Sequence, residues 1–397
     1  MQSKSYLYIF IIFFTGVCLT NMTLAEMSST RDPITLFMAG DVMTGRGIDQ
    51  VLPYPGDPRL YEPYVKDAKD YVVLAEVRNG QIQKPVQCHY IWGDALEVLE
   101  QIAPDVRLIN LETSITTSHE YWPGKGIHYK MHPKNVSCLK EARIDYCSLA
   151  NNHLLDWGYP GLTETLDSLK GVNIKISGAG ENLQEVEQPA IISVEGKGRV
   201  IVFSYGFSSS GIPSSWAAKK DRPGVNLLHS LSARTVRHVK EQIDKIKQAG
   251  DIVIASIHWG SNWGYAVPQG HIDFAHRLID DAGVDIIHGH SSHHARPLEV
   301  YKGKLIIYGS GDFINDYEGI SGHDEYRDDL VLMYFASIDP ISGKLVQLQM
   351  IPMQIEKFRL NRASEKDIVW LKDTFNRESK VLGTRIQLSE DNVLTIH

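Results

Sequence analysis

The densest group of chemically active side chains lies between positions 288 and 294, where four of seven residues are histidine: His288, His290, His293 and His294. Packing alone does not explain so many imidazoles in so short a stretch. Imidazole nitrogens bind Zn, Mn, Fe and similar ions. The run therefore favours a metal site over a purely structural role.

Oxygen-bearing side chains that suit harder cations occur in other segments. Asp41 follows a glycine at the end of an apolar run, Glu112 ends an Asn-Leu-Glu motif, and Asn152 precedes His153. Each has an ordinary alternative, because a helix cap, a rim ion pair and a hydrogen-bonded turn use the same residue types. His258 closes a very apolar run, where a lone histidine also fits a structural role.

Together these residues form a mixed nitrogen and oxygen set that needs no thiolate, which argues against a closed structural zinc site. They are too many for one ion with open positions. Two divalent ions, Mn, Zn or Fe, that share one carboxylate are the economical arrangement. A pair about 3.5–4 Å apart activates water and clamps a transferring group. Asp156, in a glycine-rich turn, is placed to orient His153.

Six short apolar runs each end in a polar, potentially metal-binding residue, and this pattern predicts how the fold positions them. In open α/β sheets, ligands bind at the carboxyl ends of the strands. The six ends should therefore meet at one rim of the fold. The runs span residues 34–38, 106–109, 144–149, 252–257, 284–287 and 304–308.

Helical patterns alternate with these strands, which is typical of an α/β protein. No clear boundary interrupts residues 33–397, so we expect one domain there. Residues 52–91, rich in Tyr and Pro, are expected to form an irregular insertion near the rim. Helices are predicted over 161–170, 232–250, 269–283 and 365–377, and a hairpin over 331–338 and 345–350.

Composition limits the classes of ligand. The 397 residues are 43% hydrophobic and 22% charged, as in ordinary globular proteins, and the formal net charge is -8 without a long basic run. Nucleic-acid binding is disfavoured, because neutralising phosphates needs clustered Lys and Arg. An anionic polymer would need a local cation, such as a bound metal.

The N-terminus predicts export. Residues 1–25 resemble a signal peptide, with one early charge at Lys4, an apolar run over 6–14 and a small-residue cleavage site that ends at Ala25. The apolar run is short for a membrane-spanning helix. An uncleaved anchor remains the alternative. We expect a periplasmic or extracellular protein.

Three cysteines would remain after cleavage: Cys88, Cys138 and Cys147. An odd number does not imply a full disulfide framework. We expect buried thiols, with a single bridge left open.

In order along the chain, the motifs resemble those of the CapA family, the capsule and poly-γ-glutamate synthesis proteins. The resemblance covers nearly the whole mature chain. That family is similar to calcineurin-like metallophosphoesterases, which implies a four-layer α-β-β-α sandwich. The matching motifs are Gly40-Asp41-Val42-Met43-Thr44-Gly45-Arg46, Asn110-Leu111-Glu112, Ala150-Asn151-Asn152-His153 with Asp156 and Gly158, His258-Trp259-Gly260, Gly289-His290 to His293 with Pro297 and Glu299, and Gly311-Asp312-Phe313.

The resemblance also implies roles. Asp41 would bridge the metals, Glu112 would replace the usual aspartate, and Asn152 would bind the second metal. The shells would be completed by His258, His290 and His293, with His153 as general acid. Two departures stand out. Met43 replaces a histidine ligand of many phosphoesterases, and Ser291-Ser292 precedes His293, so that His294 competes with it as ligand.

Arg46 and Arg296 are candidates for binding an anionic substrate, with a surface ion pair as the equal alternative. The first hypothesis is a metal-dependent hydrolase that cleaves a phosphoester or a γ-glutamyl amide. The second is a non-catalytic partner of a membrane-bound synthase that binds an anionic polymer and aids its export. A third, carbohydrate binding, would use Trp259, Trp263 and Tyr265 as a stacking platform; a core-edge aromatic patch is the alternative.

Overall fold

The alternation of side chains along strand β1 (Ile34–Val42) builds two buried surfaces at once. In this computed structural model, which describes residues 31–396, Leu36 and Met38 face one hydrophobic cluster and Phe37 and Ala39 face another. Successive side chains of a strand point to opposite faces of the sheet. The strand is therefore covered by apolar partners on both sides.

The larger sheet has ten strands. Its centre is parallel, with β1 beside β2, β5 and β6, while the hairpin of β17 and β18 extends it antiparallel on the other side of β1. Its strands are β1, β2 (Val106–Leu111), β5 (Tyr146–Ser148), β6 (Lys175–Ser177), β16 (Asp312–Ile314), β17 (Leu330–Ile338), β18 (Leu345–Glu356), β19 (Arg359–Arg362), β20 (Ile386–Leu388) and β21 (Leu394–Ile396).

The smaller sheet has seven strands, of which β9, β12, β13 and β15 run parallel in its centre. Two further pairs, β3 with β4 and β7 with β10, form small separate sheets. The bounds are β8 (Ala190–Val194), β9 (Gly198–Phe207), β11 (Leu227–Leu228), β12 (Asp251–His258), β13 (Ile286–His290), β14 (Leu298–Tyr301), β15 (Lys304–Ile307), β3 (Ser114–Ile115), β4 (Lys130–Met131), β7 (Ala179–Gly180) and β10 (Gly224–Val225).

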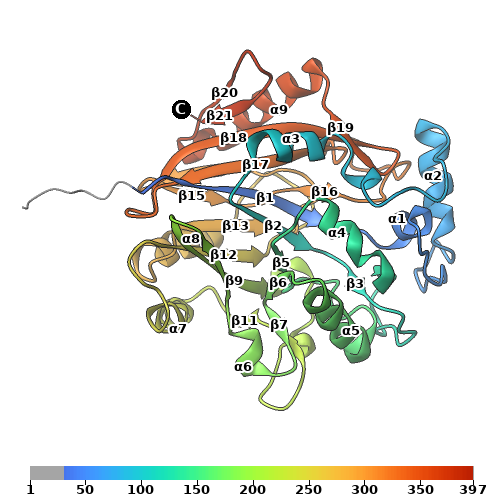
Figure 1. Cartoon of the computed structure of the whole chain (residues 1–397), viewed down its shortest axis with the longest axis horizontal. Coiled ribbons are helices and arrows are strands. Elements are labelled where there is room, and N and C mark those ends of the chain that lie inside the picture. The colour runs from blue at the N-terminus through green and yellow to red at the C-terminus, as the bar shows by residue number, and fades with distance from the viewer. Residues whose placement is uncertain (1–30, 397) are drawn as a thin grey trace, which may run out of the picture. The chain divides into compact units, whose positions relative to one another are not determined.

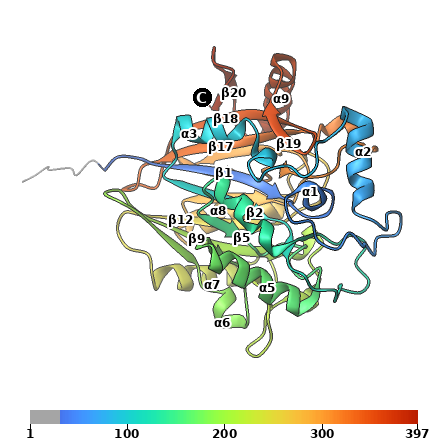
Figure 2. The same ribbon diagram turned by 45° about the vertical axis from the view of Figure 1, so that its right-hand side comes forward.

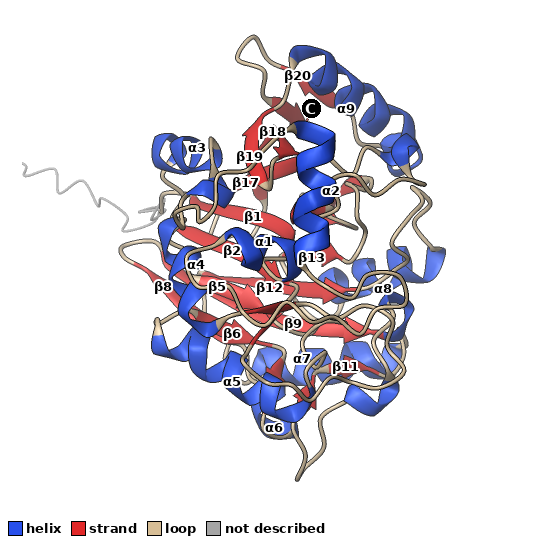
Figure 3. Cartoon of the chain, turned by 90° about the vertical axis from the view of Figure 1, so that its right-hand side faces the viewer, coloured by secondary structure: helices blue, strands red, loops and turns tan. Residues whose placement is uncertain are grey.

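Helices lie around the strands (Figures 1 and 3). Side chains of α1, α3, α4 and α5 pack on the ten-stranded sheet, those of α7 and α8 pack on the seven-stranded sheet, and a third cluster lies between the sheets. The α/β prediction is confirmed. The helices are α1 (Arg46–Val51), α2 (Lys69–Asn79), α3 (Ala95–Ile102), α4 (Ser137–Glu141), α5 (Gly158–Gly171), α6 (Leu183–Val186), α7 (Ala233–Asp244), α8 (Gln269–Asp280) and α9 (Glu365–Glu378).

The parallel strands of both sheets deliver their carboxyl ends to neighbouring positions. In the ten-stranded sheet, Asp41 of β1 is in register with Asn110 of β2 and with Asp312 of β16. In the seven-stranded sheet, His258 of β12 is in register with His290 of β13. Figure 2 shows β1 running into α1, with α2 beside it.

Two predicted segments differ from the structure. The insertion at residues 52–91 contains the helix α2, which lacks a capping side chain at Ala68 and exposes Val73 and Val77, so its apolar periodicity is weak. The helix expected over 232–250 begins after the Ser232 cap but ends at Asp244. Residues 245–250 form turns that lead into β12 instead.

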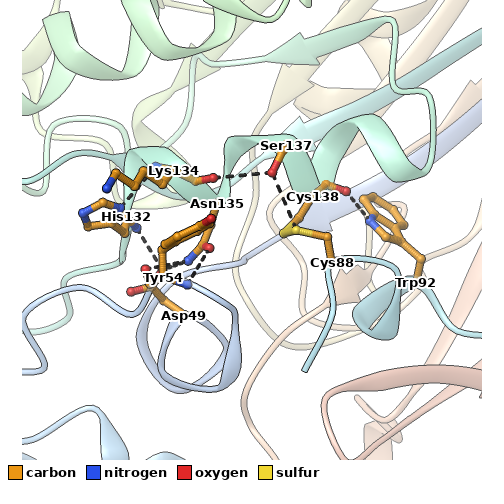
Figure 4. Close-up of a disulfide and its surroundings, with 9 residues drawn as sticks. All are labelled: Asp49, Tyr54, Cys88, Trp92, His132, Lys134, Asn135, Ser137 and Cys138. Atoms are coloured by element: carbon orange, nitrogen blue, oxygen red, sulfur yellow. Dashed lines mark hydrogen bonds between the residues drawn. A yellow bond between two sulfur atoms is a disulfide. The ribbon is translucent and has the colours of Figure 1, made fainter. Parts of the chain in front are cut away.

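The expectation of three buried thiols was wrong for two of the cysteines. Cys88 and Cys138 form a disulfide, with their Cα atoms 4.5 Å apart (Figure 4). The bridge joins the insertion to α4, and Trp92 donates its indole N–H to the Cys138 carbonyl at 2.7 Å. Only the folded path of the insertion brings these cysteines together. Cys147 is a free, buried thiol, as expected.

The predicted signal peptide at residues 1–25 lies outside the described residues. Among residues 31–396, no helix is both long and apolar enough to cross a membrane. Residues from Arg31 onward form one compact unit.

Candidate metal centre

Asp41 lies at the centre of the rim and is held from both sheets. The Asn110 side-chain amide donates to Asp41 Oδ1 at 2.7 Å, and the Ser291 backbone N–H donates to Oδ2 at 3.1 Å. The carboxyl group is 1% exposed. These two donors fix the orientation of both oxygens.

Two histidines of the seven-stranded sheet meet Asp41. The Nδ1 atoms of His258 and His290 lie 4.0 and 3.9 Å from Asp41 Oδ1 and 2.8 Å from each other. Both rings are fully buried. The Ser256 hydroxyl lies 2.9 Å from the other ring nitrogen of His290 and so fixes that ring. We name Asp41, His258 and His290 the nitrogen group.

A second set contains carboxylates only. Asp41, Glu112 and Asp312 each place an oxygen within 4.8 Å of the other two, and all three are buried. We name them the oxygen group. Among the described residues, Glu112 Oε2 has no hydrogen-bond partner. A buried oxygen without a donor is costly, so this atom calls for a cation or a water.

The electrostatics of the oxygen group point the same way. Burial, reinforced by the nearby Asp312 carboxylate, raises the pKa of Asp41 to about 8. Burial and repulsion from Asp41 also raise the pKa of Glu112 well above its usual range. Without a cation, these groups resist ionisation together. The donor set therefore fits divalent metal, with Asp41 common to both groups.

Asn152 touches the nitrogen group through His258. Its side-chain oxygen lies 2.8 Å from His258 Nε2, and the same nitrogen lies 3.7 Å from Glu112 Oε1. The structure thus brings five of the six predicted ligands, Asp41, Glu112, Asn152, His258 and His290, into one buried neighbourhood.

The sixth predicted ligand, His293, lies one layer out. Its Nδ1 is 3.0 Å from Asp312 Oδ2 and its Nε2 is 2.9 Å from the Asn262 amide. Burial opposes the charged ring, but the Asp312 carboxylate outweighs it and the pKa of His293 is raised. His294 points elsewhere, with its ring stacked on Tyr326. Neither belongs to the nitrogen group or the oxygen group.

Asp312 was not assigned a role from the sequence. The signal was present, because this residue follows the last of the six apolar runs in the Gly-Asp-Phe motif. Its parallel register with Asp41 reveals its place. Asn315 donates to Asp312 Oδ2 at 2.8 Å and orients the carboxylate.

His153 faces the centre from the loop after β5. Its Nε2 lies 3.8 Å from Glu112 Oε1, its Nδ1 lies 2.7 Å from Asp156 Oδ2, and its ring stacks on Tyr129 at 3.8 Å. Burial, assisted by the positive charge of Lys125, lowers the pKa of His153 well below its usual range. The neutral ring is therefore the resting form at pH 7.

Lys125 is a second residue that the sequence did not single out. Its ammonium lies 2.9 Å from His153 Nδ1 and 2.5 Å from Asp156 Oδ1. It comes from the loop between β3 and β4, where Gly124 and Gly126 flank it. A lysine between two glycines is typical of an exposed turn, so the pattern gave no warning of these contacts.

The two arginines considered for substrate binding are both buried, but only Arg46 is paired with carboxylates; the Nε of Arg296 has no hydrogen-bond partner among the described residues. Arg46 pairs with Asp316 at 3.0 Å and with Glu62 at 3.1 Å. Arg296 donates to backbone carbonyls of the 261–263 loop, including that of Ser261 at 2.8 Å. A surface ion pair, the alternative suggested for both, is wrong, because each residue is only 3% exposed.

The aromatic residues considered for sugar stacking do not form one platform. Trp259 is buried and stacks on His271 at 4.4 Å. Trp263 and Tyr265 are partly buried and pack around His294. Trp259 thus belongs to the edge of the core, as the alternative predicted. Trp263 and Tyr265 line the loop beside the histidine cluster.

A pocket of about 370 Å³ adjoins the centre. Its inner wall includes Asn315, which binds Asp312, and Tyr317, whose ring centroid is 5.1 Å from that of His293. Burial and then the Asp312 charge raise the pKa of Asp328 in the same wall to about 6. The pocket wall is therefore joined to the oxygen group by the hydrogen bond from Asn315 to Asp312.

The wall of this pocket carries more carboxylates than cations. Its acidic residues are Glu318, Asp324, Asp328, Asp329 and Glu356, and its basic residues are Arg78 and Arg327. Arg327 is committed to Asp329 at 2.7 Å and Asp367 at 2.8 Å. Without metal, the pocket repels a polyanion.

Comparison with known proteins agrees with the motifs. Residues 35–317 match the family model described as bacterial capsule synthesis protein PGA_cap. A "probable polyglutamine synthesis accessory protein" of Mycobacterium tuberculosis is 50% identical over 371 residues, which cover 93% of this chain and 97% of the relative. The PGA biosynthesis protein CapA of Bacillus subtilis is 29% identical over 309 residues, 76% of this chain and 68% of the relative.

Among solved structures, the chain is similar to a phosphatase from Mycoplasma pneumoniae, with a TM-score of 0.47 and 14% identity over 84% of this chain and 95% of the other. The family match spans most of the chain and contains Asp41, Glu112, His258, His290 and Asp312. The resemblance to CapA proteins is confirmed. The chain belongs to the bacterial capsule synthesis protein PGA_cap family.

Proposed function

We propose that this chain is an exported, metal-dependent hydrolase that cleaves a γ-glutamyl amide or a phosphoester during synthesis of an anionic capsule polymer. The observation that carries the proposal is the position of His153. Its Nε2 faces the candidate metal ligands at 3.8 Å from Glu112, while Asp156 and Lys125 hold the far side of the ring. A protein that only held a metal would not need this arrangement.

In the proposal, the nitrogen group would hold one divalent ion and the oxygen group would hold the other, with Asp41 belonging to both groups. Asn152 would add an oxygen beside the nitrogen group, and His293 would orient Asp312. When bound, such a pair lowers the pKa of water and offsets negative charge on the reacting group. Mn, Zn and Fe all suit the mixed donors.

The protein groups then have separate tasks. His153 directs Nε2 at the leaving group and hydrogen-bonds or protonates it as the bond breaks. Tyr129 stacks on the ring and excludes water from that face. Asp156 also accepts the Tyr129 N–H at 2.6 Å, so that the ring, its carboxylate and its stacking partner form one rigid unit.

The substrate class comes from the family and the pocket. The names of the relatives refer to polyglutamine or PGA synthesis, which favours a poly-γ-glutamate chain as ligand. Arg46 is paired with Asp316 and Glu62, so the carboxylates of such a chain would be held mainly by the metal charge. The pocket next to Asp312 offers room for the adjoining unit.

Export is supported by two features. The sequence of residues 1–25 resembles a signal peptide. The Cys88–Cys138 disulfide suits an oxidising compartment, because cytosolic thiols are kept reduced. A membrane-bound polymer synthase is the partner that this location and family favour.

In a second candidate function, the chain binds the anionic polymer but does not cleave it. Met43 is buried directly after β1, where a histidine ligand would stand in many phosphoesterases. With one ligand fewer, the site would bind a metal ion less tightly. The chain would then bind an anionic polymer and pass it to export machinery without cleaving it. His153 has no role in that version.

The two functions separate in one experiment. The secreted form would be purified, its metals counted, and hydrolysis of bis(p-nitrophenyl) phosphate and poly-γ-glutamate measured for wild type, His153→Ala and Asp41→Asn. We expect turnover in wild type, none in Asp41→Asn, and strongly reduced turnover with both metals retained in His153→Ala. Polymer binding without turnover in wild type would favour the non-catalytic partner.

A further inference from the structure

The hydroxyl groups of Tyr129 and Tyr317 form a hydrogen-bonded pair beside the metal centre. Their oxygens lie 2.6 Å apart, and neither hydroxyl bonds a further partner among the described residues. Each phenol carries one proton at neutral pH, and a bond between two hydroxyls uses only one of the two. The pair therefore holds one O–H proton for which this part of the chain supplies no acceptor.

Tyr129 is fixed on the Glu112 side of the centre. Its ring stacks on that of His153 at 3.8 Å, and His153 Nε2 lies 3.8 Å from Glu112 Oε1. Its backbone N–H donates to Asp156 Oδ2 at 2.6 Å. Tyr129 is only 4% exposed, and a buried donor without an acceptor is costly. Its hydroxyl proton is therefore the one that bonds the Tyr317 oxygen.

Tyr317 is fixed on the Asp312 side and reaches the adjoining pocket. Its ring centroid lies 5.1 Å from that of His293. Its backbone N–H donates to Asn315 Oδ1 at 3.1 Å, and the Asn315 amide in turn donates to Asp312. Tyr317 is partly buried and lines the pocket of about 370 Å³. Because its oxygen accepts from Tyr129, the proton left over is its own.

Arg46 holds both rings in place. Its guanidinium carbon lies 4.9 Å from the ring centroid of Tyr129 and 5.8 Å from that of Tyr317, within the range of cation–π attraction. The guanidinium is itself fixed by Asp316 at 3.0 Å and Glu62 at 3.1 Å. The spare proton thus belongs to a donor whose position is set before any ligand arrives.

We propose that Tyr317 donates a hydrogen bond to an anionic oxygen of the molecule that binds at the metal centre, and that Tyr129 orients this donor. The oxygen belongs to a phosphoryl group or a carboxylate, since charged acceptors make the stronger hydrogen bonds. A chain of two hydroxyls is also a better donor than one phenol alone. The role rests on the proposed function, because it needs a ligand that reaches the centre.

The test is anion binding, measured by calorimetry at pH 7.5 on protein loaded with Mn²⁺ and then desalted. The probes are inorganic phosphate and glutarate, neither of which has a bond to hydrolyse. We expect Tyr317→Phe to weaken binding of at least one probe by about ten- to a hundredfold, the range for a hydrogen bond to a charged group. The probe that loses affinity identifies the class of the oxygen.

Two further variants sharpen the test. Tyr129→Phe should weaken the same probe by only about threefold, because Tyr317 keeps its proton and loses only the cooperative contribution of its neighbour. Tyr64→Phe, at an exposed tyrosine of the insertion, is the matched control and should change neither probe. Metal content should be equal in all variants.

If Tyr317→Phe does not fold, the double variant Tyr129→Phe/Tyr317→Phe replaces it, because removing both partners leaves no unpaired group. It should lose the same factor. Unchanged affinity for both probes in the folded variant, no binding of either by wild type, loss of metal with the Tyr317 hydroxyl, or a larger loss in Tyr129→Phe than in Tyr317→Phe would overturn the proposal. The expected losses in a chain without turnover on any substrate would sink the hydrolase and leave the role of Tyr317 intact.

Discussion

The two sheets supply chemically different sides of the same centre. The ten-stranded sheet contributes oxygens, from Asp41, Glu112 and Asp312, whereas the seven-stranded sheet contributes the ring nitrogens of His258 and His290. Carboxylates suit Mn and Mg, and imidazoles suit Zn, Fe and similar ions. Because only Asp41 belongs to both groups, the two positions should be separable in metal preference.

The difference also explains the electrostatics. Burial, and after it the repulsion among three neighbouring carboxylates, raises the pKa of Asp41 and Glu112. The buried histidines resist protonation instead, and burial lowers the pKa of His258 and His290 well below the usual range. A bound divalent ion would offset the negative charge of the carboxylates and accept the lone pairs of the neutral imidazoles.

Removing one ligand from either side should have the largest effect. Asp312→Asn should leave one ion, bound with zinc preference at the nitrogen group, and His290→Ala should leave one, with manganese preference at the oxygen group. A metal contributes several kcal/mol of transition-state stabilisation, so turnover should fall on the order of a thousandfold. Metal analysis after dialysis against each ion checks this.

Asp373→Asn is the matched control, because Asp373 is exposed on α9 and belongs to neither group nor to the pocket. It should keep two ions and full turnover. If Asp312→Asn and His290→Ala lost metals without any difference in preference, the division into two chemically distinct sides would be wrong.

His153 lies on neither side and should separate catalysis from binding. His153→Ala should lower turnover by on the order of a hundredfold, a modest contribution for a positioned proton donor. Both ions should remain. His238→Ala, at an exposed histidine of α7, is the control and should change neither quantity. Loss of metal in His153→Ala would instead make this residue a ligand.

A smaller effect should come from the hydroxyl behind the nitrogen group. Ser256 lies 2.9 Å from His290 Nε2 and fixes the ring. Ser256→Ala should weaken zinc binding by about tenfold, the low end for a group that orients a metal ligand. Ser193→Ala, on an exposed position of β8, should not. Equal titrations of the two variants with Zn²⁺ would show that Ser256 does not orient His290.

The smallest expected effect concerns the proton that Asp41 of the oxygen group holds when no metal is bound. The pKa of Asp41 is raised to about 8, so at pH 7 the metal-free folded chain holds a proton there that the unfolded chain has lost. The contribution of this group to stability therefore falls as pH rises from 7 through 8. Metal binding at pH 7 should release about one proton from Asp41.

Two measurements check this titration. Calorimetry in buffers of different ionisation enthalpy counts the released protons. Thermal unfolding of metal-free wild type and Asp41→Asn at pH 7 and pH 8.5 compares the chain with and without this ionisable group and its repulsion of Glu112. A wild type that gained stability relative to Asp41→Asn over this range would contradict the raised pKa.

Sequence patterns predicted the parts of the centre that follow a strand directly. Asp41, Glu112, His258 and His290 each lie at or just beyond the end of a predicted apolar run, and parallel strands bring such ends together. Asn152 and His153 follow the short strand β5 in the same way. The α/β fold was predictable for the same reason, because strand and helix periodicities alternate along the chain.

What the sequence did not reveal depends on long-range geometry. The ligand position of Asp312 needs the register of β16 with β1, and the contact of Lys125 with Asp156 needs the path of the loop between β3 and β4. The pairing of Cys88 with Cys138 needs the folded insertion. Only Asp312 left a signal, because it follows the last apolar run; the other two features leave no periodic or spacing signal.

The most direct measurement of the metal centre is the number of ions bound per chain by wild type and by Asp41→Asn, with Mn²⁺ and Zn²⁺ supplied together and the protein then desalted. Two ions in wild type and none or one weakly held ion in Asp41→Asn are predicted, because both groups share that carboxylate. A wild-type chain without bound metal, or an unchanged count of two after the substitution, would contradict it.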